Sequence, residues 1–284
     1  MTKTIWLAGH DGHRLAASAT GPDGGFPVLL AHGGGQTRRA WRKTADMLAG
    51  RGYRVVAFDL RGHGESDWAA RAEDYNVDWF ARDMVAVAGS FATPPAYVGA
   101  SLGGTSGIIA AGEVAPGCVA SLTLVDIAAA VSDAGVERIM AFMGRHVAEG
   151  FASPDEAAHA IADYTPERPR RGASDSLRHY LRKGADGRYR WHWDPKFMSG
   201  VNGRDMSRVG RMDAAAANLK LPVHLVRGRE SDLLTPEGVA HFLELCPHAE
   251  FTDIAGAGHM VVGDKNDAFS EAIAGFLART HPPR

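Results

Sequence analysis

Short apolar runs alternate with longer amphipathic segments along most of this 284-residue chain. The short runs have the length of strands, and the segments between them repeat apolar residues at helical spacing. The predicted strands are Thr4–Ala8, Leu15–Thr20, Val28–Ala31, Val55–Phe58, Ala96–Gly99, Val119–Val125, Val223–Val226 and Glu250–Ile254. The predicted helices are Trp41–Ala49, Val77–Ser90, Leu102–Glu113, Pro236–Leu245 and Asp267–Arg279. Strands separated by helices indicate an α/β fold with a mostly parallel sheet.

The alternation stops after Asp126 and resumes only at Val223. From about Ser132 to Leu219 the chain is rich in Arg, Asp, Ala and aromatic residues, is interrupted by four prolines, and contains no convincing strand. We therefore predict a core made of residues 1–128 and 216–284, with residues 129–215 inserted as a helical region.

Charge and cysteine content exclude several classes of function. The 31 basic and 33 acidic residues nearly cancel, so no overall charge attracts nucleic acid or an anionic membrane. The first 13 residues lack the apolar stretch of a signal peptide. With only two cysteines, a disulfide framework or a Cys-rich metal site is not expected, and the cytoplasm is the predicted compartment. We expect no metal and no organic cofactor, and the oligomeric state stays open between monomer and homodimer.

Glycines are numerous, at 34, and one group of them surrounds a serine. The segment from Gly99 to Gly103 reads Gly-Ala-Ser-Leu-Gly and lies between a predicted strand and a predicted helix. In a nucleophile elbow the serine occupies a strained strand-to-helix turn, and small residues on both sides allow close packing of the strand and the helix. Ser101 is therefore the predicted nucleophile.

A serine hydroxyl needs a base and an acid that orients the base. His259 follows the predicted strand Glu250–Ile254 within a glycine-rich loop, and is the predicted base. Asp232 follows the strand Val223–Val226 and is the favoured acid, which gives the chain order Ser, Asp, His. Asp126, directly after the strand that ends at Val125, is the alternative acid. Glu230 is a third candidate.

Three successive glycines, Gly33 to Gly35, follow His32 and the strand Val28–Ala31. Such a run lets backbone N–H groups face a cavity, as an oxyanion hole requires. The predicted donors are the N–H groups of Gly34 and of Leu102, the residue after the nucleophile. A histidine at position 32 more often braces such a loop than acts as a base. A phosphate-binding loop is rejected, because no Lys-Ser/Thr pair follows the glycines.

With these motifs the chain resembles the α/β-hydrolase superfamily, in the branch that has an HGGG-type loop and a cap. The turn from Asp59 to Ser66, Asp-Leu-Arg-Gly-His-Gly-Glu-Ser, also matches this branch, in which its role is usually structural. The resemblance covers nearly the whole chain. It implies a mostly parallel eight-stranded sheet flanked by helices, with the helical cap between the sixth and seventh strands.

The resemblance also implies a reaction. Epoxide hydrolases and haloalkane dehalogenases of this fold have Asp at the nucleophile position, so Ser101 argues against both. A serine hydrolase that cleaves a small carboxylic ester or lactone is the main expectation. A C–C bond hydrolase and a cofactor-free perhydrolase on the same triad are alternatives, and a non-catalytic or slow ligand receptor of this fold is an alternative of another class. Ala100, where C–C hydrolases commonly have Asn, weakens the first of these alternatives.

The insertion would cover Ser101 and select the substrate. Most of its aromatic and Met side chains are expected to pack the cap onto the core, and a few are candidates for lining a substrate pocket. Together with His32, the candidates are Phe142, Met143, Trp191, Trp193 and Met260.

Overall fold

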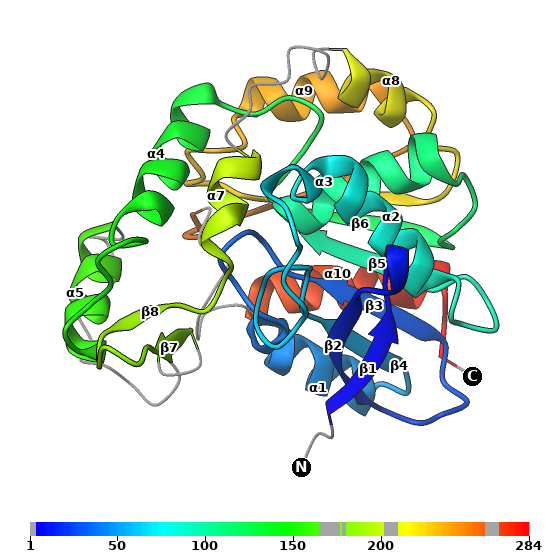
Figure 1. Ribbon diagram of the computed structural model, residues 1–284. Coiled ribbons are helices and arrows are strands. Elements are labelled where there is room, and N and C mark those ends of the chain that lie inside the picture. The colour runs from blue at the N-terminus through cyan, green and yellow to red at the C-terminus, as the bar shows by residue number, and fades with distance from the viewer. Residues whose placement is uncertain (1–3, 165–176, 178–179, 202–209, 259–266, 284) are drawn as a thin grey trace.

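The computed structural model describes residues 4–164, 177, 180–201, 210–258 and 267–283. Its centre is an eight-stranded sheet in the order β1-β2-β4-β3-β5-β6-β9-β10 (Figure 1). The antiparallel β1 and β2 form one edge, and the six strands from β4 to β10 are parallel. The bounds are β1 Thr4–Ala8, β2 Arg14–Thr20, β3 Pro27–Ala31, β4 Arg54–Phe58, β5 Ala96–Ala100, β6 Ser121–Val125, β9 Val223–Gly228 and β10 Glu250–Ile254. The predicted fold class and all eight predicted strands are confirmed.

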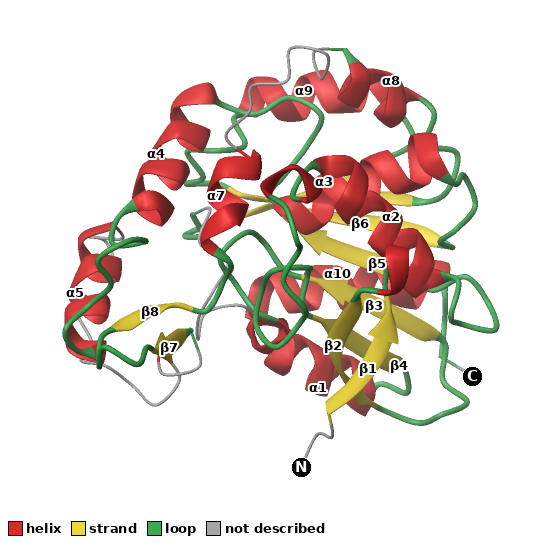
Figure 2. Cartoon of the chain, in the orientation of Figure 1, coloured by secondary structure: helices red, strands yellow, loops and turns green. Residues whose placement is uncertain are grey.

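Helices cover both faces of the sheet (Figure 2). Successive strand residues point to opposite faces, so Leu29 joins one apolar core and Leu30 the other. Helices α1 (Arg42–Gly50) and α10 (Asp267–Thr280) pack on the Leu30 side. The Leu29 side is covered by α2 Val77–Ala88, α3 Leu102–Ile109 with its π-helical continuation η4 Ala110–Val114, α8 Arg211–Ala217 and α9 Pro236–Leu245.

The insertion forms a separate layer beyond the carboxyl ends of the strands, to the left in Figure 1. It contains α4 (Asp133–Gly144), α5 (Pro154–Tyr164) and α7 (Pro195–Val201). Helix α8 lies across the predicted end of the insertion but packs against α3 and α9 of the core, and Gly112 of η4 has no room for a side chain next to Ala215.

The expectation that the insertion holds no strand is wrong. Strands β7 (Leu181–Lys183) and β8 (Tyr189–Trp191) form an antiparallel hairpin in the cap. Gly187 has a φ of +78° and follows Asp186, a pair that favours a tight hairpin turn. Three-residue strands are too short to show a period, which is why the alternation does not reveal them.

None of the described helices is long and apolar enough to cross a bilayer.

Candidate active site

Ser101 lies on a strained turn between β5 and α3. Its φ of 46° and ψ of −115° are rare for a residue with a side chain. Glycines permit the turn, because a Cβ on Gly99 would lie 2.5 Å from the Gly103 carbonyl carbon, and one on Gly103 would lie 2.7 Å from the Ala31 oxygen. The close approach of strand and helix that the glycine spacing predicts is confirmed.

The glycine loop after β3 lies against the serine. A Cβ built on Gly33 would be 3.2 Å from Ser101 Cβ. Among the described residues, the N–H groups of Gly34 and Leu102 have no hydrogen-bond acceptor. Leu102 is the first residue of α3, so its N–H adds to the positive end of the helix dipole. Both predicted oxyanion donors are thus unpaired within the part of the chain that the structure describes.

The His32 ring binds this loop from within the core and does not line a substrate pocket. Its ring is fully buried, with Nδ1 2.7 Å from the Gly33 carbonyl oxygen and Nε2 accepting the Leu60 N–H at 3.0 Å. Burial lowers the pKa of His32 to about 4, so the ring is neutral. Both ring nitrogens are occupied, which leaves His32 with a bracing role and not the pocket-lining role that was one expectation for it.

Asp126 is the carboxylate next to the serine at the sheet edge. Ala100 of β5 pairs with Val125 of β6, so Ser101 and Asp126 are the next residues on neighbouring strands. Asp126 is fully buried and has a φ of 53°. Its Oδ1 accepts the Gly228 N–H at 3.0 Å and its Oδ2 accepts the Ser231 hydroxyl at 2.6 Å. A buried, hydrogen-bonded carboxylate on a strained residue is a common feature of functional sites.

Asp232, the favoured acid from the sequence, faces the cap. Its side chain is 37% exposed and pairs with Arg138 of α4, with an N–O distance of 2.6 Å. Its backbone oxygen lies 2.5 Å from the position of a Cβ on Gly135, so α4 packs directly on the Asp232 backbone. Asp232 therefore joins the core to the cap. The third candidate, Glu230, is on the same loop and its N–H binds the Ala257 oxygen at 2.9 Å.

The predicted base His259 and the pocket candidate Met260 lie outside the described residues. The chain is described up to Gly258, where it packs against Gly228 of β9. A Cβ on Gly228 would be 2.5 Å from the Ala257 oxygen and 3.0 Å from the Gly258 oxygen. Gly228 is also the residue whose N–H binds Asp126. Gly258 and Asp126 therefore both contact Gly228.

The turn from Asp59 to Ser66 forms a buried polar support behind the glycine loop. Asp59 binds the Arg38 guanidinium and the N–H groups of Arg38 and Glu65. Burial raises the pKa of Asp59. Arg61 pairs with Asp83 of α2 through two bonds of 2.6 and 2.7 Å, and both side chains are 1% exposed. These contacts tie the turn to the core and give it a structural role.

Three apolar cap side chains cover the glycine loop. The Met143 sulfur is 3.9 Å from a Cβ position on Gly34, and the Phe197 ring is 3.5 Å from the same point. The Trp193 ring is 3.3 Å from a Cβ on Gly35. Of the pocket candidates, Met143 and Trp193 are thus placed over the predicted oxyanion hole. Phe197, another aromatic residue of the insertion that the sequence offered for a pocket lining, joins them there.

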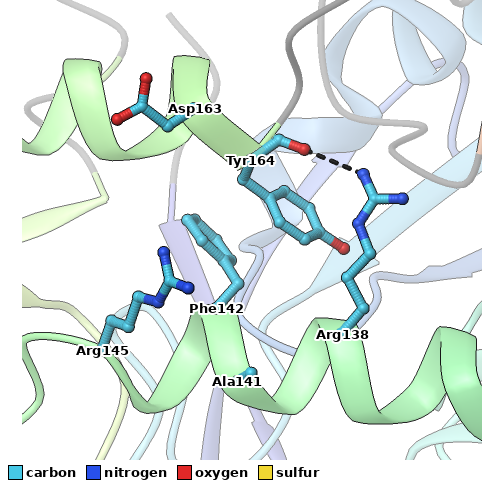
Figure 3. A pocket seen from close by; sticks show the side chains of 6 residues that line it. All are labelled: Arg138, Ala141, Phe142, Arg145, Asp163 and Tyr164. Carbon is cyan, nitrogen blue, oxygen red and sulfur yellow. Dashed lines mark hydrogen bonds between the residues drawn. The ribbon is translucent and has the colours of Figure 1, made fainter.

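The other two candidates lie farther into the cap. Trp191 stacks on Trp193, with ring centroids 5.0 Å apart and planes inclined by 11°. Phe142 stacks on Tyr164 of α5 at 4.2 Å. Phe142 also lines a cavity of about 360 Å³ between α4 and α5 (Figure 3). The other residues of this cavity are Arg138, Ala141, Arg145, Asp163 and Tyr164.

No group of three potential metal ligands occurs among the described residues.

Two further histidines support the glycine loop, and sequence reasoning did not find either role. His63 Nε2 accepts the Gly35 N–H at 3.0 Å, and burial lowers the pKa of His63 to about 3. His192 of the cap lies against the same glycine. The Gly-His-Gly pattern around position 63 was a usable signal, whereas nothing in the local sequence connects His192 with Gly35.

Comparison with known proteins agrees with this architecture. The family model described as alpha/beta hydrolase fold matches residues 27–266. A 3-hydroxybutyrate-oligomer hydrolase of Cupriavidus necator is 31% identical over 260 residues, covering 87% of both chains. An esterase of Mycobacterium tuberculosis is 28% identical over 256 residues, covering 88% of this chain and 82% of its own. A crystal structure of an alpha/beta hydrolase from Novosphingobium aromaticivorans superposes with a TM-score of 0.80 at 25% identity and covers 98% of each chain.

Proposed function

Because the chain belongs to the alpha/beta hydrolase family, we propose that it hydrolyses small carboxylic esters or lactones through an acyl-enzyme on Ser101. The observation that carries the proposal is the strained Ser101 beside two N–H groups, of Gly34 and Leu102, that have no acceptor in the described part of the chain. Donors fixed in this way stabilise the negative oxygen that forms when a hydroxyl attacks a carbonyl. The relatives, an oligomer hydrolase and an esterase, support the same reaction class.

In the proposed reaction, His259 takes the Ser101 proton while the hydroxyl oxygen attacks the ester carbonyl carbon. The carbonyl oxygen becomes an oxyanion held by the Gly34 and Leu102 N–H groups. Collapse of the tetrahedral intermediate breaks the bond to the leaving alkoxide, which receives the proton from His259. Water then attacks the acyl-enzyme by the same route, which releases the acid and restores Ser101.

Asp126 is the acid that we propose for this triad, in place of Asp232. It is buried at the end of the strand next to Ser101, and its two oxygens each accept a hydrogen bond that fixes the carboxylate. A triad acid must hold the imidazole in one orientation, which needs a rigid carboxylate. The Asp232 carboxylate is instead partly exposed and paired with Arg138.

The substrate is proposed to be apolar around the scissile bond. Met143, Trp193 and Phe197 cover the glycine loop, so the group beside the carbonyl would contact a thioether and two aromatic rings. The Cupriavidus relative acts on 3-hydroxybutyrate oligomers, and short esters of hydroxy acids are therefore among the first substrates to assay.

The test compares S101A with S106A on p-nitrophenyl butyrate. Ser106 is a matched control because it lies on the same helix and its hydroxyl donates to the Leu102 carbonyl at 2.7 Å. We expect S101A to lose at least about 10⁴-fold in kcat, and S106A to stay within about tenfold of the wild type, since its loss is one ordinary hydrogen bond.

Covalent labelling gives a second measurement. A fluorophosphonate should add to Ser101 of the wild type and of S106A, and peptide mass spectrometry should find no adduct in S101A. An S101A variant with wild-type turnover would disprove the proposal. Saturable binding of esters and lactones without turnover would indicate a receptor instead.

A further inference from the structure

Three histidines hold the glycine loop, and each binds a different peptide group. The carbonyl of Gly33 accepts from His32 Nδ1 at 2.7 Å, and the N–H of Gly35 donates to His63 Nε2 at 3.0 Å. The carbonyl of Gly35 accepts from His192 Nε2 at 3.2 Å. The three successive peptide planes between Gly33 and Gln36 therefore each have one imidazole partner.

This arrangement determines where the Gly34 N–H points. The Gly33 carbonyl also accepts the Gln36 N–H at 3.1 Å, which closes a turn with Gly35 at a φ of +75°. In a planar trans peptide the N–H is directed opposite to the carbonyl. The Gly34 N–H is thus directed away from the bonds of the Gly33 oxygen. Consecutive glycines have large conformational freedom, so the loop depends on such partners for a single shape.

The tautomers of the His63 and His192 rings follow from their hydrogen-bond partners. His192 Nδ1 accepts the Gly64 N–H at 2.8 Å, so the proton of this neutral ring is on Nε2 and is donated to Gly35. His63 Nδ1 is 3.0 Å from the Arg61 carbonyl, so its proton is on Nδ1 and Nε2 accepts. Burial lowers the pKa of both rings and keeps them neutral.

His192 differs from the other two because it comes from the cap. Its ring is buried, and the backbone N–H of His192 donates to the Tyr180 carbonyl oxygen at 3.0 Å. Two residues later, the Asp194 N–H binds the Gly62 oxygen at 2.8 Å and its carboxylate accepts the Tyr75 hydroxyl at 2.7 Å. The backbone on both sides of His192 is therefore fixed, and the ring is a rigid link between the cap and the glycine loop.

We infer that His192 is a positioning residue for the oxyanion hole, so that the cap completes the catalytic geometry in addition to covering the site. The inference rests on the proposed function, because it assigns the Gly34 N–H to an oxyanion. His192 acts through Gly35 and does not touch the substrate in this role. Losing its bond leaves the Gly35–Gln36 peptide held only through the Gln36 N–H, so the turn that carries the Gly34 N–H can vary.

Three variants test the inference: H192F, H192Q and H224F. Phenylalanine keeps the volume of the ring but can neither donate to Gly35 nor accept from Gly64, whereas the glutamine amide can do both. His224 is a matched control, since it is buried, binds Thr252 at 2.9 Å and stacks on Phe276, away from the loop.

We expect H192F to lower kcat on p-nitrophenyl butyrate by about 10- to 100-fold, less than the loss of a whole oxyanion donor. KM should stay within about threefold, because the oxyanion forms only in the transition state. H192Q should recover kcat to within about fivefold of the wild type, and H224F should leave kcat and KM within about threefold. Equal losses in H192F and H192Q, or an H192F kcat within threefold of the wild type, would overturn the inference.

Two measurements do not depend on turnover. Ring ¹⁵N NMR of the wild type should show the proton on Nε2 of His192 and on Nδ1 of His63, and the reverse tautomer would overturn the assignment. Amide exchange at Gly35 and Gln36 should speed up at least tenfold in H192F, and far less in H192Q and H224F. Absence of esterase activity in the wild type would disprove the proposed function. Unchanged amide exchange in H192F would instead disprove the link between His192 and the glycine loop.

Discussion

The core side and the cap side of the candidate site are held in place by different means. On the core side, backbone geometry places the groups: Ser101 has a positive φ, and Gly99 and Gly103 touch without side chains between them. On the cap side, side chains do so, through the Trp193 ring over Gly35 and the His192 bond to the same residue. Short-range motifs encode the first kind of order, and contacts between distant residues provide the second.

The largest expected effect separates the two carboxylates. D126N should lower kcat/KM by about 10³- to 10⁴-fold, because an amide favours the wrong imidazole tautomer. D232N removes a charge that faces the cap and should cost less than about tenfold. Steady-state kinetics of both variants decide the acid. A large loss in D232N with a small one in D126N would return the assignment to Asp232.

A glycine-to-alanine pair tests the claim that backbone contacts hold the core side. G103A would bring a Cβ to 2.7 Å from the Ala31 oxygen and 2.9 Å from the His32 oxygen, so we expect a loss of about 2–3 kcal/mol in unfolding free energy. In G144A, at the end of α4, the new Cβ meets only Met198 among the described residues, at 3.9 Å, so stability should change by at most about 1 kcal/mol. Urea denaturation measures both. Similar stability of the two variants would contradict the comparison.

The buried histidines predict a loss of stability on mild acidification. The folded-state pKa values of His32 and His63, about 4 and about 3, lie below the ordinary value of 6.5. Above pH 6.5 the rings are neutral in both states and contribute no pH dependence. As the pH falls below 6.5 the unfolded chain binds protons that the folded chain does not, and each such ring removes about 1.4 kcal/mol per pH unit.

The urea midpoint at pH 7.5, 6.5, 6.0 and 5.5 measures this slope. H224F is an internal calibration, since burial also lowers the pKa of His224 to about 4. Replacing this ring should reduce the dependence of the unfolding free energy on pH by about 1.4 kcal/mol per pH unit. A urea midpoint that stays constant between pH 6.5 and 5.5 would show that the histidine rings also bind protons in the folded state.

The smallest expected effect concerns the ion pair between core and cap. Arg138 and Asp232 are 52% and 37% exposed, so their pairing should contribute at most about 1 kcal/mol to stability. A double-mutant cycle with R138Q and D232N, followed by urea denaturation, measures the coupling. A coupling above 2 kcal/mol would mean that this contact, and not the buried segment around His192, fixes the cap.

The sequence was sufficient for the sheet and for the position of the serine. Strand length and helical spacing are local properties, and the Gly-x-Ser-x-Gly pattern at a strand end specifies both the strain at Ser101 and the contact of Gly99 with Gly103. Local sequence could not distinguish Asp126 from Asp232 as the acid. Both follow parallel strands, and only burial and partners, Ser231 for one and Arg138 for the other, distinguish them.

The cap was the part that sequence could not resolve. Its hairpin has three-residue strands, and the ring of His192 binds a glycine 157 positions earlier in the chain. An isolated histidine in an irregular region carries no periodic or motif signal. The bracing role of His32 could be predicted because it adjoins the glycine run, whereas that of His192 arises only from a contact between distant parts of the chain.

The bonds from Asp194 to Gly62 and from Gly64 to His192 have a consequence for engineering. The cap elements lie in one continuous stretch of chain between β6 and β9, which makes them a convenient unit to exchange when a new substrate is wanted. Here the stretch from Trp191 to Phe197 is bonded into the support of the glycine loop. A chimaera should therefore take its foreign helices from the region before Trp191 and retain the native residues from there to Phe197.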